Sequence, residues 1–259
     1  MGQLPESAAH QARDWDDLAL VDPFWAILSE TQPGDRGWQL DRFFERGEAD
    51  VESVLGVARE LGWQGGISSA LDFGCGVGRL TRALAGHFES CTGVDISERM
   101  LEHARRLNAD CANCRFVVNR SSDLALFADD AFDFVLSFVV LQHVASAQAA
   151  LLYISEFVRV ACPGGLVVFQ LPSTLSARNR LQLRRRAYGL LRAVRVPPDV
   201  LQRRLRLNPM RMIGVSEPEV RRTVEASGGV LARADPDWLA PGITGFRYFV
   251  LVPEDDAQG

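Results

Sequence analysis

The sequence predicts an α/β fold with a doubly wound, mostly parallel sheet of seven strands, and three observations support this prediction. From residue 70 onward, short runs rich in β-branched and aromatic residues alternate with helical patterns. A glycine-rich turn joins the first strand to the helix that follows it, and an aspartate ends the second strand. Such features are typical of parallel sheets whose carboxyl edge holds a ligand.

Five apolar runs are predicted as the first strands of the sheet. Their residues are 70–73, 91–94, 116–118, 132–138 and 166–171. Helical patterns at residues 79–87, 97–108 and 146–162 fit between them. The third helix is expected to stop at Cys162-Pro163-Gly164-Gly165, because proline and paired glycines prevent its continuation.

The C-terminal part is predicted to hold one helix and two strands. Ser216-Glu217-Pro218-Glu219 has the spacing of a capping box, with proline in the first turn of the helix. Gly228-Gly229 is expected to end this helix. Strands that start at Val230 and cover residues 246–252 would complete the sheet, and the acidic tail, residues 255–259, is expected to fray.

Before the sheet, residues 10–62 have a helical pattern and contain Trp15, Trp25 and Trp38. They are too few to fold alone, so we expect them to cover the sheet as a lid. The predicted segments are an N-terminal helical lid (1–62), a core that binds the cofactor (63–172), an arginine-rich helical cap inserted after the fifth strand (173–213), the C-terminal part of the core (214–254) and a tail (255–259).

Composition places the chain among globular proteins. It has 259 residues, of which 47% are hydrophobic, enough for one large α/β domain. No apolar stretch of membrane-spanning length and no secretory leader is visible, so we expect a soluble, cytoplasmic protein with reduced thiols. Cys111 and Cys114 have the spacing of half a zinc site, but no second pair follows, and we expect no metal.

The glycine-rich turn contains Gly74, Gly76 and Gly78. Glycines let the backbone turn tightly and approach a ligand, while the N-terminus of the following helix presents free N–H groups. The nicotinamide dinucleotide fingerprint needs the spacing G-x-G-x-x-G, whereas Arg79 follows the third glycine here. The turn therefore indicates a nucleotide-type site and disfavours a dinucleotide.

Asp95 ends the second strand, where a carboxylate can accept hydrogen bonds from both hydroxyls of a ribose. Together with the turn, it makes the chain resemble the class I S-adenosylmethionine-dependent methyltransferases, in particular the small-molecule branch that includes the ubiquinone/menaquinone-biosynthesis type. The motifs that carry the resemblance are LDFGCGVG (71–78), FDFVLS (132–137), LQHV (141–144) and PGG (163–165). The resemblance implies a Rossmann-like core.

By this resemblance the cofactor is S-adenosyl-L-methionine. The turn from Gly74 to Gly78, with Cys75 and Gly76, would hold its methionine part. Asp72 would lie near its amino group, and Asp95 would bind its ribose. A Cys75 that only fills space in the turn is the alternative for that residue.

The resemblance also implies an adenine pocket. Ile96 and Met100 would flank the ring, although both are equally typical packing residues. Family members often place an acid after the third strand, where Arg120 stands here, so we carry that role to Asp123, with Ser122 contributing its backbone. Leu124 and Phe138 complete the expected cofactor site.

Methyl transfer from a sulfonium is an in-line displacement, to which a protein contributes mainly by aligning donor and acceptor. A base is needed only if the acceptor is a hydroxyl or a similar group. His143, just beyond the fourth strand, is our candidate for this catalytic role. The alternative is that it only forms a hydrogen bond with the backbone.

The acceptor is expected to be a small or lipophilic, possibly anionic, metabolite methylated on oxygen, nitrogen or carbon. Enzymes that methylate the amino groups of nucleic-acid bases resemble one another in an Asn/Asp-Pro-Pro-aromatic turn after the fourth strand. Here that position reads Ser137-Phe138-Val139-Val140, which disfavours a nucleic-acid substrate.

The predicted cap is strongly basic. Residues 176–212 contain eleven arginines and one acid, Asp199, in a chain whose net charge is −5 and which has no lysine. Apolar residues interleave with the arginines at helical spacing, which predicts two amphipathic helices around residues 196–198. These arginines could bind a phosphate or carboxylate of the substrate, an anionic membrane surface or RNA, or form a solvated face paired with acidic residues of this chain or of a second subunit.

A rival prediction keeps the cofactor site without methyl transfer. The same scaffold could serve a cyclase, a decarboxylase or a regulator, and the basic segment could serve an RNA-binding module. The sequence leaves the oligomeric state open between monomer and homodimer.

Overall fold

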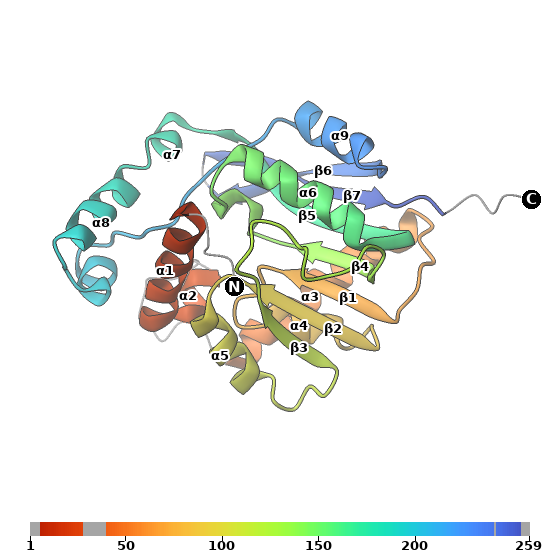
Figure 1. Cartoon of the computed structure of the whole chain (residues 1–259), viewed down its shortest axis with the longest axis horizontal. Coiled ribbons are helices and arrows are strands. Elements are labelled where there is room, and N and C mark those ends of the chain that lie inside the picture. Colours follow the sequence, from red (N-terminus) through yellow and green to blue (C-terminus); the bar gives the residue numbers. More distant parts are fainter. Residues whose placement is uncertain (1–5, 28–39, 241, 255–259) are drawn as a thin grey trace, which may run out of the picture.

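The structure is a computed structural model that describes residues 6–27, 40–240 and 242–254. Within them, seven strands form one sheet in the order β3-β2-β1-β4-β5-β7-β6 (Figure 1). The strands are β1 (Ser69–Phe73), β2 (Ser90–Asp95), β3 (Cys114–Val118), β4 (Phe132–Ser137), β5 (Ala161–Leu175), β6 (Val230–Ala240) and β7 (Ile243–Leu251). Strand β7 runs antiparallel to β5 and β6, and the pairs from β3 to β5 are parallel. This confirms the predicted fold class.

Helices cover both faces of the sheet (Figure 1). They are α3 (Leu40–Glu60) and α4 (Arg79–Leu84) on one face, α6 (Ala147–Val160) and α9 (Glu217–Ala226) on the other, and α5 (Glu98–Leu107) beside β3. The amphipathic α3 buries Val54 against Leu84 and Phe134. The sheet is therefore enclosed on both faces, which leaves its carboxyl edge for a ligand.

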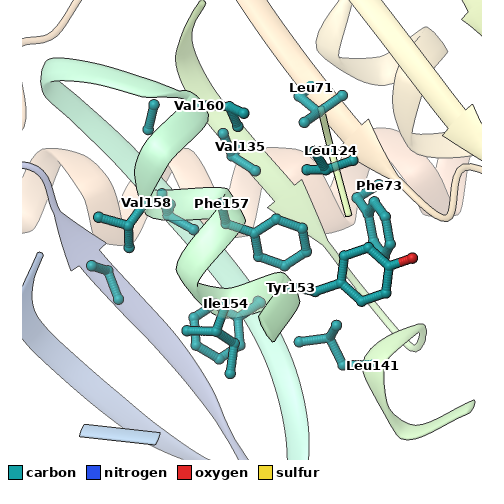
Figure 2. Close-up of a cluster of buried hydrophobic side chains, with 14 of the residues drawn as sticks. Leu71, Phe73, Leu124, Val135, Leu141, Tyr153, Ile154, Phe157, Val158 and Val160 are labelled. Atoms are coloured by element: carbon teal, nitrogen blue, oxygen red, sulfur yellow. The ribbon is translucent and has the colours of Figure 1, made fainter. Parts of the chain in front are cut away.

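The larger hydrophobic cluster lies between α6 and the sheet (Figure 2). Phe157 is fully buried, and its ring centroid lies 5.1 Å from that of Phe73 and 6.4 Å from that of Phe169. Truncating such a side chain to alanine costs about 3–5 kcal/mol. This packing fixes α6, whose first turn borders the candidate site.

The predicted helix 146–162 ends earlier than expected. Helix α6 ends at Val160, and Ala161 is already the first residue of β5. Residues 163–165 therefore lie inside a strand, where the pairing with β4 shifts register between Phe132 and Phe134. The proline and glycines were read as a helix stop, but Gly164 and Gly165 exchange backbone hydrogen bonds with Val252, so they form part of an irregular strand.

The predicted capping box is confirmed. Ser216 caps α9, and the carboxylate of Glu219 accepts a hydrogen bond from the backbone N–H of Ser216. The helix ends at Ala226, just before the glycine pair 228–229 that was predicted to end it. Ser97 and Ser146 cap α5 and α6 in a similar way through their side chains.

The N-terminal segment divides into two parts. Helices α1 (Glu6–Val21) and α2 (Pro23–Ile27) lie at the carboxyl edge of the sheet, whereas α3 packs on a face of the sheet. Of the predicted lid, only α1 and α2 therefore lie where they could cover the carboxyl edge of the sheet. Trp38 of the predicted lid and the predicted tail, residues 255–259, lie outside the described residues.

The insertion after β5 forms α7 (Ala177–Leu181), α8 (Leu183–Ala193) and a π-helical turn, η2 (Val200–Arg204). Helix α8 and η2 lie at the edge of the molecule, with α1 between them and the sheet, whereas α7 lies next to β5 (Figure 1). Two full helices around residues 196–198 were predicted, and this is wrong for the second, which is a single turn. Tyr188 and Leu201 are buried, but other apolar residues of this segment are exposed.

None of the helices among the described residues has the length and apolar content needed to cross a bilayer.

Candidate active site

A cavity of about 390 Å³ lies at the carboxyl ends of β1, β2 and β4. Its walls come from the turn after β1, the segments after β2, β3 and β4, the first turns of α6, and helices α1 and α2. This volume lies in the range typical of small-molecule sites. The cavity thus occupies the edge where the sequence placed its candidate residues.

Ten of the predicted site residues border this cavity. They are Asp72, Gly74, Cys75, Gly76, Asp95, Ile96, Met100, Ser122, Phe138 and His143. Gly78, Asp123 and Leu124 do not border it. The structure therefore brings together residues from the ends of four strands, β3, β2, β1 and β4, which are neighbours in the sheet.

Backbone geometry explains the glycines of the turn. Gly74 and Gly76 have φ angles of 76° and 54°, in the left-handed region that glycine adopts without strain. A Cβ at Gly74 would lie 2.3 Å from Cγ2 of Val140, so the turn passes too close to the segment after β4 for any side chain. The backbone N–H groups of Gly74 and Cys75 donate to the carbonyl of Val94, which fixes the turn against β2.

Gly78 serves the fold and not the cavity. Its φ angle is 82°, and a Cβ there would lie 2.7 Å from both Asn108 Nδ2 and Phe116 Cζ. Asn108 in turn donates a hydrogen bond to the carbonyl of Val77. This glycine lets the start of α4 pack against the end of α5 and against β3.

Asp95 bridges the turn and the start of α5. Its Oδ2 accepts a hydrogen bond from the backbone N–H of Gly76, and its Oδ1 accepts one from that of Ser97, both at 2.9 Å. Burial raises the pKa of the Asp95 carboxyl, and the backbone donors oppose that rise. A carboxylate has about four acceptor positions, so about two remain for hydroxyl groups of a ligand.

Asp72, at the end of β1, is 2% exposed. Thr81 Oγ1 donates a hydrogen bond to its Oδ2 at 2.7 Å. Burial raises the pKa of Asp72 to about 6, while the bond from Thr81 and the charge of Arg79 lower it. The cavity therefore has one buried carboxyl group, Asp72, and one half-buried carboxyl group, Asp95, which favour a ligand with a positive charge.

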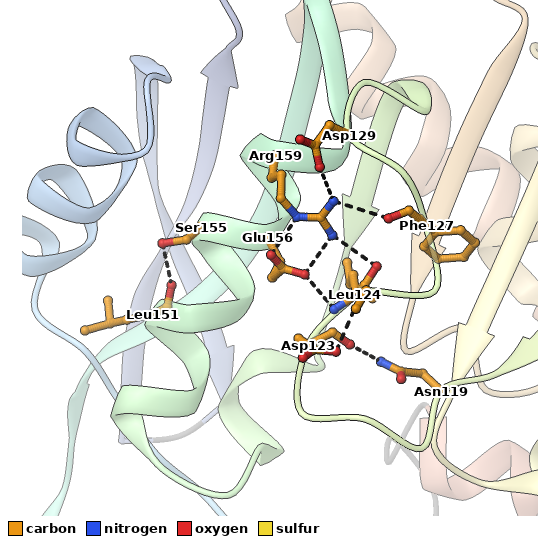
Figure 3. Close-up of polar contacts among 10 residues, drawn as sticks. Asn119, Asp123, Leu124, Phe127, Asp129, Leu151, Ser155, Glu156 and Arg159 are labelled. Atoms are coloured by element: carbon orange, nitrogen blue, oxygen red, sulfur yellow. Dashed lines mark hydrogen bonds and ion pairs between the residues drawn. The ribbon is translucent and has the colours of Figure 1, made fainter. Parts of the chain in front are cut away.

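The segment after β3 is held to α6 (Figure 3), and its Asp123 and Leu124 do not border the cavity. Leu124 is fully buried in the core, and its N–H donates to Glu156 Oε2 at 2.7 Å. Arg159 binds this carboxylate and also the carbonyl of Leu124. Because α6 holds the segment in this way, Asn119 and Ser121 border the cavity beside Ser122, and Asp123 is exposed.

His143 lies in a 3-10 turn (Leu141–His143) after β4. Its Nδ1 lies 2.6 Å from the carbonyl oxygen of Arg211, and its Nε2 lies 3.2 Å from Nε2 of Gln142. Burial lowers the pKa of His143. Because the carbonyl of Arg211 accepts a hydrogen bond and the amide of Gln142 donates one, we assign a neutral ring with the proton on Nδ1 and a lone pair on Nε2.

The segment just before this turn is strained. Val139 has a φ angle of 61°, a left-handed conformation that costs a β-branched residue about 1–3 kcal/mol. It borders the cavity next to Phe138, whose ring lies under the guanidinium of Arg247 at 4.9 Å. Such strain is concentrated at functional sites.

Sequence reasoning missed the cavity residues that depend on long-range packing. From α1 and α2 these are Gln11, Trp15 and Ile27. Arg79 also borders the cavity, is 4% exposed and forms an ion pair with Asp50 at 2.6 Å. Within the described residues its Nε has no hydrogen-bond partner. The position of Arg79 directly after the glycine turn was the sequence feature that could have identified it as a site residue.

Comparisons with known proteins agree with this geometry. Residues 71–169 match the family model of a methyltransferase domain. Nodulation protein S from Rhizobium tropici is 29% identical over 147 residues, which are 56% of this chain and 58% of that protein. Demethylmenaquinone methyltransferase from Staphylococcus aureus (strain MRSA252) is 36% identical over 115 residues, 43% of this chain and 46% of that protein. The chain spans about half the length of the curated relatives it matches.

Two solved structures are similar over most of the chain. Magnesium protoporphyrin IX methyltransferase from Synechocystis PCC 6803, with bound S-adenosylmethionine, has a TM-score of 0.61 and 18% identity over 97% of this chain and 99% of that one. A SAM-dependent methyltransferase from Leishmania major has a TM-score of 0.62 and 15% identity over 94% and 82% of the two chains. The fold is therefore that of class I methyltransferases. Over residues 71–169, the resemblance that the motifs indicated is confirmed as that of a methyltransferase domain.

Proposed function

We propose that this protein transfers a methyl group from S-adenosyl-L-methionine to oxygen, nitrogen or carbon of a small or lipophilic metabolite. The observation that carries the proposal is the junction of Gly76 and Asp95, where a strain-free glycine backbone meets a half-buried carboxylate with unused acceptor positions. The cavity beside this junction has the volume of a small-molecule site.

The residues present fit the cofactor. Asp95 would accept hydrogen bonds from its ribose hydroxyls, and the turn at Gly74 and Gly76 would leave room for its methionine part. Asp72 would attract its amino group, and the charge of Arg79, which borders the cavity, would attract its carboxylate. Ile96, Met100 and Phe138 would supply apolar surface for the adenine, with Ser122 at its edge.

The cofactor, when bound, supplies a methyl group on a positively charged sulfur. The protein's share is to hold donor and acceptor in line, and such alignment lowers a barrier by about 7–11 kcal/mol. His143 is the proposed base where the acceptor is a hydroxyl. Its Nε2 lone pair faces the amide of Gln142, so that amide has to move before Nε2 can take a proton.

Calorimetric titration with S-adenosylhomocysteine, the demethylated product, tests the site. We expect saturable binding that Asp95→Asn weakens by about tenfold or more, because hydrogen bonds to a charged group contribute about 1.5–3 kcal/mol each. Asp110→Asn is the matched control, since that carboxylate is exposed and pairs only with Arg82 among the described residues. Absence of binding, or equal binding by the two variants, would overturn the proposal.

Release of the same product during incubation with fractionated metabolites tests turnover. A fraction that supports release in wild type identifies the acceptor class. Binding of S-adenosylhomocysteine without release from any fraction would instead favour a cyclase, decarboxylase or regulator on the same scaffold.

A further inference from the structure

Helix α8 has an apolar stripe that faces solvent. Leu183, Leu190 and Val194 are 64%, 72% and 71% exposed. Their spacing of seven and four residues places them on one side of the helix. The opposite side packs on α1, where Tyr188 and Arg192 both form hydrogen bonds with Asp17. Because the opposite side of α8 is held on α1, the helix has a fixed orientation, and the apolar stripe is exposed in that orientation.

Arginines flank this stripe. Arg184 and Arg186 are exposed, and neither pairs with a carboxylate in the part of the chain that the structure describes. Residues 176–212 contain eleven arginines and a single acid, Asp199, although the whole chain has a net charge of −5. Positive charge and exposed leucines thus gather on the same insertion.

We propose that the outer face of α8, defined by Leu183, Arg184, Arg186, Leu190 and Val194, docks on an anionic lipid bilayer. The three apolar side chains enter the boundary between headgroups and acyl chains, and the arginines bind lipid phosphates. This docking goes beyond the proposed methyl transfer and does not depend on it. Delivery of a lipophilic acceptor from the bilayer to the cavity would rest on the proposed function.

Two other occupants fit this face less well. A second copy of the chain, bound about a two-fold axis, would set these arginines against the same arginines of the partner. RNA would bind the arginines but leave the leucine stripe in water. An anionic bilayer satisfies both features at once.

The docking face and the cavity are connected through one helix. On one side of α1, Gln11 donates a hydrogen bond to the carbonyl of His143, and the ring of Trp15 lies 5.6 Å from that of His143. On the other side, Asp17 holds Arg192 and Tyr188 of α8. A bilayer in contact with α8 would therefore lie one helix away from the cavity.

Flotation with vesicles tests the proposal directly. We use vesicles of phosphatidylcholine alone and vesicles with about 30% phosphatidylglycerol, without any cofactor. Wild type is expected to float only with the anionic vesicles and to be released by about 0.5 M salt. Leu183→Ser/Leu190→Ser/Val194→Ser and, separately, Arg184→Gln/Arg186→Gln should each reduce the bound fraction by about tenfold or more.

Matched controls lie on other surfaces. Ile67→Ser removes an apolar side chain that is 57% exposed, and Arg222→Gln removes an exposed arginine of α9; both should float like wild type. Equal loss in controls and test variants, or no flotation of wild type, would overturn the proposal. Loss of a dimer in the serine variant, measured by light scattering, or salt-sensitive RNA retention without flotation, would assign the face to a second copy or to RNA.

The same preparations are titrated with S-adenosylhomocysteine. Wild type that binds this ligand but no vesicles refutes the docking alone. Wild type that floats but binds no ligand refutes the proposed function alone.

Discussion

Replacing Asp72 by asparagine tests the electrostatics of the cavity without any ligand. Burial raises the pKa of this carboxyl from 3.8 to about 6. In an unfolded chain the pKa of aspartate stays near about 3.9. Between these two values the folded protein keeps a proton that the unfolded chain releases. Wild type therefore loses stability as the pH rises through this window, and the asparagine variant does not.

The magnitude follows from the shift. A change of about two pKa units corresponds to about 3 kcal/mol, since one unit is worth about 1.4 kcal/mol. About 2 kcal/mol of this is lost between about pH 4.5 and about pH 7.5. The free energy of unfolding of Asp72→Asn, relative to wild type, should rise by this amount over the same range.

Urea unfolding followed by circular dichroism at a series of pH values measures the difference. Other titrating groups cancel between the two proteins as long as they lie apart from Asp72. Thr81→Val offers a second perturbation, because it removes the hydrogen bond that lowers the Asp72 pKa. It should move the loss of stability to higher pH. A difference between wild type and Asp72→Asn that stays constant within about 0.5 kcal/mol would refute the reasoning.

Four further predictions concern other residues. His143→Ala should lower product release far more than affinity for S-adenosylhomocysteine, and an unchanged rate would remove its proposed role. Gly74→Ala should weaken that affinity about tenfold or more and lower the free energy of unfolding by about 1–3 kcal/mol, because of its positive φ angle and crowded Cβ position. Gly189→Ala, in open space on α8, should leave affinity unchanged and stabilise the fold by about 0.5–1 kcal/mol. Asp17→Asn removes the anion that Arg192 binds and should speed proteolysis within residues 176–212; an unchanged cleavage pattern would show that the insertion is held elsewhere.

Most of the correct predictions rest on local sequence patterns. The order of strands and helices follows from alternating patterns, and Ser216 with Glu219 identifies the start of α9 without any tertiary information. The signal failed at residues 163–165, because proline and glycine break a helix and distort a strand equally well. Only the pairing with Val252 distinguishes the two outcomes.

Exposure in the insertion could not be read from spacing alone. Tyr188 and Leu190 both fit a helical apolar pattern, yet one is 2% and the other 72% exposed. What decides between them is the position of Asp17 on α1, which is 171 residues away from Tyr188 in the sequence. A pattern states that a helix has two faces, and only the packed structure tells which of them is covered.

The lining of the cavity also divides into a part that sequence motifs identify and a part that only the packed structure shows. The residues proposed for the cofactor lie between Asp72 and Phe138, inside the matched range 71–169. Part of the remaining wall comes from the segment after β4 and the start of α6 and lies inside that range, whereas Gln11, Trp15, Ala26 and Ile27 of α1 and α2 lie outside it. Similarity to relatives within the matched range thus covers the proposed cofactor end of the cavity and the wall after β4, but not the wall from α1 and α2. We therefore expect α1 and α2 to contribute to the choice of acceptor, and substitution of Trp15 to change substrate preference more than substitution in the glycine turn.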